Sequence, residues 1–499
     1  MTQSDYKNLL DTLLELRESV CEDGEKLYQK WEPNISRRAF QISGQNLANY
    51  IIFRQHDLRG MQRDLMPLGL SSLGRCESRV LPNLDATIAS LGAICGVDDG
   101  NLPSHPSADT FFEGEHLLRH HTEKLLGASN HDRWVRIMVT LPSDAAENYE
   151  FFREILNRGT NCVRINCAHD GPEAWQKMVE HLRRGVAETG QPCQLLMDLG
   201  GIQARTADTI APDPKQRRLH MGDRLLMTRD KPEPRSDLEF QARCTIPEIL
   251  DQLQVDQTVW IDDGKLGTRV EKIAPEGIFL KVIKARPKKG EKLKEDKGIN
   301  FPDTEYYYDS LTEKDFRNLD FIAEHADLVG HSFVQEVADL RRLQDELKKR
   351  RSAECPIGII AKIETHAAIK NLPDLIVQAA GNQPFGVMIA RGDLAVQIGY
   401  QRMAEMQEEI MWMCEAAHVP VIWATQVLEK LAKQGVPSRS EITDAAMAQR
   451  ADCVMLNKGP FIPEAVSILD DVLTRMQEHQ MKKTPQLRAL NSWSELASI

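Results

Sequence analysis

Eight short apolar segments, mostly β-branched at their centres, constrain the fold of this chain more than any other feature. Apolar runs without regular alternation are typical of parallel strands that are buried on both faces. Stretches with helical periodicity separate most of them, so we expect an α/β fold, a (β/α)8 TIM barrel with its active site at the carboxyl ends of the strands. The predicted strands are Val135–Leu141, Cys162–Ala168, Gln194–Gly201, Asp327–Val334, Ile357–Glu364, Gly386–Leu394, Pro420–Val427 and Asp452–Leu456.

Two of these segments end in charged residues. Lys362 and Glu364 are two positions apart, so on a strand both side chains point to the same face. Another apolar run stops at Arg391-Gly392-Asp393, where the glycine lets the backbone approach a ligand closely. A lone Lys-x-Glu pair is usually a surface ion pair, but this one ends a buried run. A lysine and two carboxylates at the carboxyl ends of parallel strands suit a hard divalent cation bound beside an anionic substrate.

The chain outside the strands divides into further regions. Between Thr206 and Lys297, short alternating runs bounded by turn residues predict a small inserted β domain. Residues 1–130 have helical periodicity, interrupted by a loop-like break over 66–74 and a linker-like stretch over 101–107. We interpret them as a helical bundle packed against the barrel or a partner subunit, rather than a second catalytic domain. The predicted organisation is a helical N-terminal region (1–130), a barrel (131–206 and 298–480), an inserted β lid domain (207–297) and a tail (481–499).

Several motifs occur in the order and spacing of one enzyme family. Together they resemble pyruvate kinase, over roughly residues 133–480. The resemblance implies a TIM barrel with a small β-barrel lid inserted after strand three, and transfer of a phosphoryl group from phosphoenolpyruvate to ADP. The segments that carry it are Val163–His169, Asp198–Thr206, Lys297–Pro302, Ile360–Glu364, Ala390–Leu394, Ala424–Gln426 and Pro437–Glu441.

The resemblance also implies roles for the reacting side of the site. Glu364 and Asp393 would hold Mg²⁺ (or Mn²⁺), and Lys362 would neutralise the transferring phosphoryl group and the enolate. Arg164 and Arg205 would grip phosphate oxygens. The residues expected to contact the three-carbon substrate are Arg164, the backbone of Ala390, Arg391 and Gly392, and Thr425 on the proton-delivery side.

Other implied roles concern the nucleotide and a monovalent cation. Arg205, Asn166 and His169 would contact the nucleotide, although His169 could equally serve a structural role. Asn166, Asp198 and the carbonyl of Leu199 would form a weakened K⁺ site, because the family's serine is Ala168 here.

Further departures lie on the same side of the site. The family's Thr-Lys-Gly-Pro-Glu turn is replaced by residues 199–203, and its Ser-Gly-Glu-Thr by Asn457-Lys458-Gly459-Pro460. Only about twenty residues follow Gln480, so we expect no C-terminal effector domain. Two alternatives therefore stay open. One is a catalytically degenerate barrel that binds phosphoenolpyruvate or a nucleotide in a regulatory role; the other is a phosphoenolpyruvate or oxo-acid enzyme that does not use ADP.

Composition excludes some other classes. A formal net charge of −12 argues against nucleic-acid binding, and no stretch approaches the ~20 apolar residues that span a bilayer. The first residues are polar and lack the apolar core of a signal peptide. Ten cysteines without any Cys-x-x-Cys pair indicate reduced thiols. We expect a cytoplasmic protein that forms a homo-oligomer through the barrel or the N-terminal helices.

Overall fold

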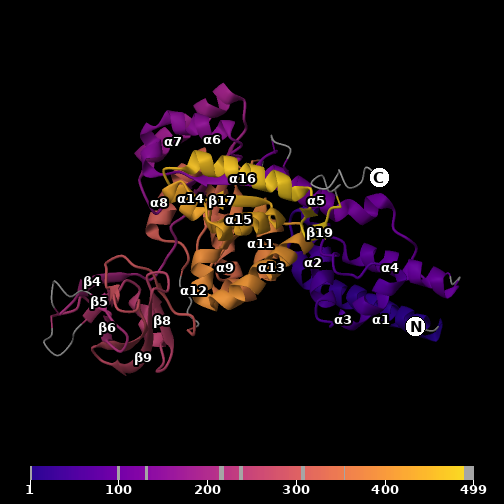
Figure 1. The fold of residues 1–499 in the computed structure, drawn as a ribbon, viewed down its shortest axis with the longest axis horizontal. Coiled ribbons are helices and arrows are strands. Elements are labelled where there is room, and N and C mark those ends of the chain that lie inside the picture. The colour runs from indigo at the N-terminus through magenta and orange to yellow at the C-terminus, as the bar shows by residue number, and fades with distance from the viewer. Residues whose placement is uncertain are drawn as a thin grey trace, which may run out of the picture.

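The computed structural model describes residues 3–97, 100, 102–129, 133–212, 218–234, 240–304, 309–352 and 355–487. The molecule has three parts, which lie in a row. Figure 1 shows the barrel in the middle, the inserted β domain at one end and helices α1, α3 and α4 at the other. Every predicted region has residues outside the described ones: 1–2, 98–99, 101 and 130 of the N-terminal region, 131–132, 305–308 and 353–354 of the barrel, 213–217 and 235–239 of the inserted domain, and 488–499 of the tail.

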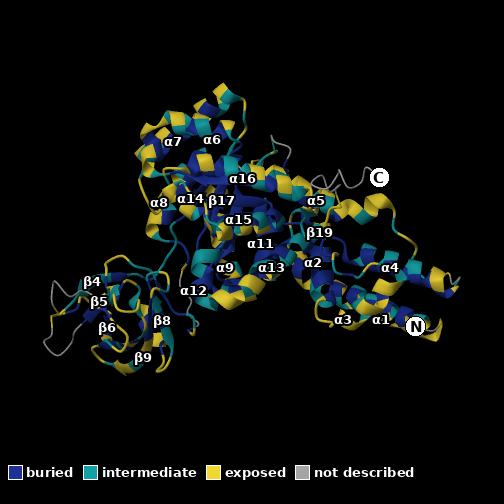
Figure 2. Ribbon diagram, in the orientation of Figure 1, coloured by how far each residue is buried: buried dark blue, intermediate teal, exposed yellow. Residues whose placement is uncertain are grey.

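Eight parallel strands close into a barrel in chain order, which confirms the predicted fold class. Their burial is nearly complete, and Figure 2 shows them as the dark centre of a shell of helices that are exposed on their outer faces. The barrel strands are β1 (Arg136–Thr140), β2 (Cys162–Asn166), β3 (Gln194–Asp198), β13 (Leu328–His331), β14 (Gly358–Ile363), β15 (Phe385–Ala390), β16 (Val421–Val427) and β17 (Cys453–Leu456).

Each surrounding helix has one apolar face, which it buries against the barrel strands. The capping boxes at Thr312 and Ser438 fix where two of them begin. The barrel helices are α6 (Tyr149–Asn157), α7 (Pro172–Thr189), α8 (Glu313–His325), α9 (Val337–Arg350), α10 (His366–Lys370), α11 (Leu372–Ala380), α12 (Arg391–Ile398), α13 (Tyr400–Ala416), α14 (Glu429–Gln434), α15 (Arg439–Met447) and α16 (Ile462–Gln477).

The inserted region forms a seven-stranded sheet in the order β12-β8-β9-β10-β6-β7-β4, with its own apolar core. Its two edge strands meet at a bridge between Arg205 and Gly298, so the sheet curls towards closure. Its strands are β4 (Thr206–Ile210), β6 (Arg224–Thr228), β7 (Phe240–Cys244), β8 (Thr258–Ile261), β9 (Leu266–Ala274), β10 (Gly277–Lys284) and β12 (Ile299–Asn300), beside a separate pair, β5 (Arg218–Leu219) and β11 (Glu291–Lys292).

The N-terminal region is helical, as predicted, and packs against the barrel. Arg37 Nη1 donates to the carbonyls of Ala380 and Gln383 at 2.9 and 2.6 Å. Asn46 Nδ2 donates to the carbonyl of Ala416 at 2.8 Å. Its helices are α1 (Gln3–Trp31), α2 (Gln41–Phe53), α3 (Arg59–Leu65), α4 (Val80–Cys95) and α5 (Ala108–Leu126).

Helix α5 ends at the amino end of the barrel and plugs it. A Cβ added to Gly358 on β14 would lie 2.5 Å from Leu125, and one added to Gly386 on β15 would lie 2.6 Å from it. Glycine at these two strand positions therefore makes room for the helix end. Leu125 and Leu126 of this helix thus complete the apolar core inside the barrel from its amino end.

The chain leaves α16 through a short hairpin, β18 (Gln480–Met481) and β19 (Thr484–Pro485). Its turn returns to the body of the molecule, because Lys482 Nζ lies 2.6 Å from Asp452 and Lys483 pairs with Glu77. Within the described ranges, no helix combines the length and apolarity needed to cross a bilayer. All ten cysteines are free thiols, as the sequence predicted.

Candidate active site

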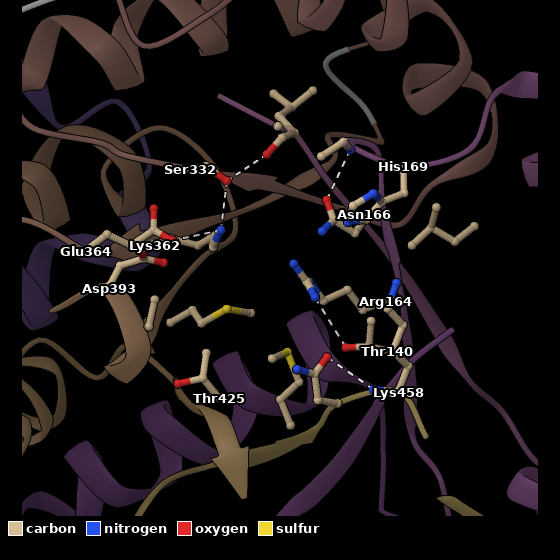
Figure 3. Close-up of a pocket in the computed structure, with 18 of the residues that line it drawn as sticks. Thr140, Arg164, Asn166, His169, Ser332, Lys362, Glu364, Asp393, Thr425 and Lys458 are labelled. Atoms are coloured by element: carbon tan, nitrogen blue, oxygen red, sulfur yellow. Dashed lines mark hydrogen bonds and ion pairs between the residues drawn. The ribbon is translucent and has the colours of Figure 1, made fainter. Parts of the chain in front are cut away.

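A cavity of about 340 Å³ opens at the carboxyl ends of the barrel strands. Figure 3 shows Lys362, Glu364 and Asp393 on one side of it and Arg164, His169 and Lys458 on the other. It brings together residues from β1, β2, β14, β15, β16 and β17 and from the loops that follow β3 and β13. The predicted site residues that line it are Arg164, Asn166, His169, Leu199, Arg205, Lys362, Glu364, Ala390, Asp393 and Thr425.

Lys362 is the centre of a hydrogen-bonded network. Its Nζ lies 2.9 Å from Glu364 Oε1 and 3.5 Å from Asp198 Oδ2, and it donates to Ser332 Oγ at 2.8 Å. Burial alone would lower the pKa of Lys362, but the carboxylates of Asp198 and Glu364 outweigh it and raise that pKa above its ordinary value. The side chain is thus held as a fixed, charged ammonium at the cavity wall.

Two carboxylates face the cavity beside this ammonium. Glu364 is 2% exposed and its Oε2 accepts the backbone N–H of Phe333 at 2.6 Å. Burial, and then the charge of Glu364, raises the pKa of Asp393 to about 7. A mutual repulsion of this kind is relieved when a cation binds between the two groups.

The structure places Asp393 differently from the sequence prediction. The strand predicted to reach Leu394 ends at Ala390, and Asp393 lies in the first turn of α12. A carboxylate is favoured there by the helix dipole, and the turn aims it back over the barrel. The apolar run could not show this, because a strand and a buried helix start have the same composition.

Arg164 is held in place by Asp198. Its Nε donates to Asp198 Oδ2 at 2.8 Å and its Nη1 to Thr140 Oγ1 at 3.3 Å. Burial would raise the pKa of Asp198, but Lys362 and Arg164 overcome it and lower that pKa. The second carboxylate oxygen, Oδ1, is buried and has no hydrogen-bond partner among the described residues. Asp198 therefore orients both cations from beneath the cavity.

The end of β16 has an unusual backbone conformation. Thr425 and Gln426 have φ of 66° and 60°, a left-handed conformation that costs of order 1–3 kcal/mol at each non-glycine residue. Arg391 supports it: Nε donates to the carbonyl of Ala424 at 3.0 Å and Nη2 to that of Thr425 at 2.6 Å. Asp444 accepts from the same guanidinium at 2.9 Å. In this conformation the Thr425 side chain lines the cavity.

Two of the residues predicted to contact substrate have other contacts here. The guanidinium of Arg391 is directed to the β16 turn and does not line the cavity. The backbone N–H of Gly392 donates to Thr425 Oγ1 at 2.9 Å. Of the Ala390-Arg391-Gly392 segment, only Ala390 lines the cavity.

The opposite side of the cavity is more open. Arg205 is 41% exposed at its side chain, and its Nη1 lies 3.2 Å from Asp296 of the inserted domain. Burial, and then the charge of Lys458, lowers the pKa of His169. Gln203 Nε2 lies 3.4 Å from Asp393 Oδ1, which links the two sides.

Two of the three residues proposed to bind a monovalent cation, Asn166 and Leu199, already have protein donors on the oxygens that they would offer. Asn166 Oδ1 accepts the backbone N–H of Ala168 at 3.1 Å, and the carbonyl of Leu199 accepts the hydroxyl of Ser332 at 2.7 Å. The ammonium of Lys314 lies 3.3 Å from the carbonyl of Ala168. A cation at this place would compete with these hydrogen bonds.

Sequence analysis missed three residues that shape the site. Ser332 lies within a predicted strand, and a polar residue near the end of a buried run was a signal that could have marked it. Thr140 occupies the same kind of position in the first strand. Asp444, which holds Arg391, lies on α15, and nothing in the sequence connects the two.

Comparison with known proteins agrees with this geometry. Residues 132–461 match the family model of the pyruvate kinase barrel domain. The chain belongs to the pyruvate kinase family. It is 29% identical over 374 residues to the pyruvate kinase PKLR of Homo sapiens, a match that spans 72% of this chain and 62% of that relative. The pyruvate kinase of Thermococcus litoralis is 28% identical over 359 residues, covering 69% of this chain and 70% of the relative.

A solved structure supports the fold assignment. A pyruvate kinase from Cryptosporidium parvum superimposes with a TM-score of 0.63 at 25% identity, over 74% of this chain and 77% of that one. The family match begins at residue 132, so helices α1 to α5 lie outside it. The chain therefore joins a pyruvate kinase barrel to a helical region that the family model does not cover.

Proposed function

We propose that this protein transfers the phosphoryl group of phosphoenolpyruvate to ADP, giving pyruvate and ATP in glycolysis. The observation that carries the proposal is the charged network of Lys362 with Glu364 and Ser332, which faces Arg164 across one cavity. Phosphoryl transfer needs positioning and charge neutralisation more than covalent chemistry, and this network supplies both.

The residues present fit a divalent cation. Burial and Glu364 raise the pKa of Asp393 to about 7, a cost that a cation between the two carboxylates would remove. In the described part of the chain, no cluster of three or more His, Cys, Asp or Glu side chains could hold a metal, so substrate and water oxygens would complete the coordination. Mg²⁺ or Mn²⁺ held by Glu364 and Asp393 would supply further neutralisation of phosphoryl charge.

The protein groups have distinct proposed roles. The P–O bond of phosphoenolpyruvate breaks, a terminal phosphate oxygen of ADP forms the new bond, and the enolate takes a proton at its methylene carbon. Lys362 would neutralise charge on the phosphoryl group and enolate oxygen, and Arg164 and Arg205 would hold phosphate oxygens. Thr425 Oγ1 accepts the Gly392 N–H, which leaves its own O–H free to direct towards the enolate carbon.

Contacts on the open side are proposed for the nucleotide and for K⁺. Asn166, His169 and Arg205 would meet the diphosphate of ADP. Asn166, Asp198 and Leu199 would form at most a weak K⁺ site, because Asn166 Oδ1 and the Leu199 carbonyl already accept hydrogen bonds from the protein and Ala168 offers no side-chain oxygen.

The test is pyruvate formation from phosphoenolpyruvate and Mg²⁺ with a panel of nucleoside diphosphates. We expect release that depends on ADP or another diphosphate. A Lys362→Met preparation made in the same way controls for host enzyme carried through purification. No pyruvate with any diphosphate would contradict the proposal.

A second candidate is an enzyme that acts on phosphoenolpyruvate or an oxo acid without ADP, such as a decarboxylase or tautomerase. The observation that favours it is the altered open side, where Gln203 contacts Asp393 and Lys458 lines the cavity. Pyruvate released without a diphosphate would support this candidate. Binding of phosphoenolpyruvate without turnover would instead indicate a degenerate barrel with a regulatory role.

The setting of the protein is also part of the proposal. Ten free thiols suit a reducing compartment, and we propose the cytoplasm. We further propose a homo-oligomer, which sedimentation of the full chain over a range of concentrations would test.

A further inference from the structure

A second cavity, of about 420 Å³, lies where the N-terminal helices meet the barrel. We call it the junction cavity and define it by Tyr50, Arg54, His56, Arg59, Trp412 and Lys483. It shares no lining residue with the cavity at the strand ends. Most of its wall comes from residues 50–77, which form the end of α2, part of α3 and the loops that follow these helices, and all of them lie outside the segment that matches the family model. The junction cavity is thus built mainly from residues that the family model does not cover.

Arg54 forms no ion pair with any carboxylate that the structure describes. Its guanidinium lies 5.0 Å from the centroid of the Trp412 ring and 5.6 Å from that of Tyr50. Its Nη1 donates to the Tyr50 hydroxyl at 2.7 Å, and within the described ranges no carboxylate comes within 4.0 Å of it. Two aromatic rings therefore fix the orientation of a planar fork whose charge is available to a ligand.

The other cations of the wall are paired, but not equally firmly. Lys483 lies 4.3 Å from the centroid of the Trp412 ring and pairs with the buried Glu77. Arg59 donates to Asp57 at 2.9 and 2.7 Å, but both side chains are largely exposed, so the pair contributes little and can open. With His56 neutral, three cations and two carboxylates leave one net positive charge at the cavity.

The hydrogen-bonding groups of the wall point the same way. Arg54, His56 and Arg59 line the cavity and carry side-chain N–H donors. Arginine and histidine N–H donors around one cavity match an acceptor-only anion.

We infer that the junction cavity binds the phosphoryl group of a small phosphorylated metabolite. A phosphate oxygen pair fits the guanidinium fork of Arg54, while Arg59 and His56 can turn towards a third oxygen. The volume accommodates a sugar monophosphate and excludes a macromolecule. The site is separate from the proposed catalysis, so its occupancy does not depend on turnover.

The test is isothermal titration of the full chain with glucose 6-phosphate and with inorganic phosphate, with glucose as the uncharged control. We expect both phosphates to bind and glucose not to bind. Arg54→Gln should weaken binding at least about tenfold, the effect of losing a charged hydrogen bond. Arg63→Gln removes the same charge from α3, away from the cavity lining, and should leave affinity unchanged.

Several outcomes would overturn the inference. They are no binding of either phosphate up to about 10 mM, equal affinity for glucose, and equal effects of the two arginine variants. If Arg54→Gln unfolds at a lower temperature than the parent protein, Arg59→Gln replaces it. This exposed side chain can be changed without disturbing the core, and weaker phosphate binding is expected there too.

Discussion

The two sides of the active-site cavity differ in how deeply their charged side chains are buried and in how firmly these are held. On one side, which we call the carboxylate wall (Ser332, Lys362, Glu364 and Asp393), Lys362 and Glu364 are almost fully buried and hydrogen-bonded. On the other, the open wall (His169, Arg205 and Lys458), the side chain of Arg205 is 41% exposed and pairs with Asp296 of the inserted domain. A charge that acts in the reaction gains from being fixed beforehand, whereas charges that receive a mobile ligand need room.

The largest expected effect comes from breaking the carboxylate wall. Lys362→Met keeps the length of the side chain and removes its charge, so kcat should fall by roughly 10² to 10³. Steady-state pyruvate formation measures it, and Lys177→Met, an exposed lysine paired with Glu147, serves as the matched control. Undiminished turnover in Lys362→Met would refute the assignment of the reacting side.

Breaking the open wall should affect binding more than turnover. Arg205→Gln removes a cation that would hold phosphate, so KM for ADP should rise roughly 10- to 100-fold, the range for a hydrogen bond to a charged group. Arg224→Gln, which changes an exposed arginine of the inserted domain paired with Glu271, should leave KM unchanged. A fall in kcat with constant KM would mean that Arg205 belongs functionally to the carboxylate wall.

A pH measurement sharpens the comparison. Burial and Glu364 raise the pKa of Asp393 to about 7, so below that pH the carboxyl group is protonated and a cation must displace the proton. Affinity for Mn²⁺, measured by electron paramagnetic resonance on the free protein, should be constant above pH 7. Below pH 7 it should fall about tenfold per pH unit. Asp393→Asn should bind more weakly and lose this pH dependence; a parent protein with no pH dependence would show that Asp393 is no ligand.

The smallest expected effect concerns K⁺. Asn166 and Leu199 already accept hydrogen bonds and Ala168 offers no side-chain oxygen, so turnover should change only a few-fold when K⁺ is replaced by tetramethylammonium at constant ionic strength. Ala168→Ser adds the missing oxygen and should increase the dependence. A collapse of about a hundredfold in the parent protein would show a working K⁺ site.

The features of the fold and of the site that could be predicted from the sequence are those that local residue patterns determine. The eight strands and the pairing of Lys362 with Glu364 follow from residue spacing, because a strand places alternate side chains on one face. The contacts of Lys362 with Ser332 and of Arg391 with Asp444 could not be predicted, since they join elements that only the barrel brings together. The apolar helical stripes of the first 130 residues can be recognised in the sequence. The surface of the barrel that these helices cover cannot.

The docking of the N-terminal helices has a consequence for how the chain is made. Trp31 bonds to Asp374, Asn46 to Ala416, and Glu77 to Lys483, so this region has partners that are synthesised several hundred residues later. Contacts of such high sequence separation form late. Until then the faces of α1 and α2 that cover the barrel stay uncovered, and a nascent chain in that state is exposed to aggregation. We expect production of this protein to depend on chaperone capacity more than production of a barrel alone.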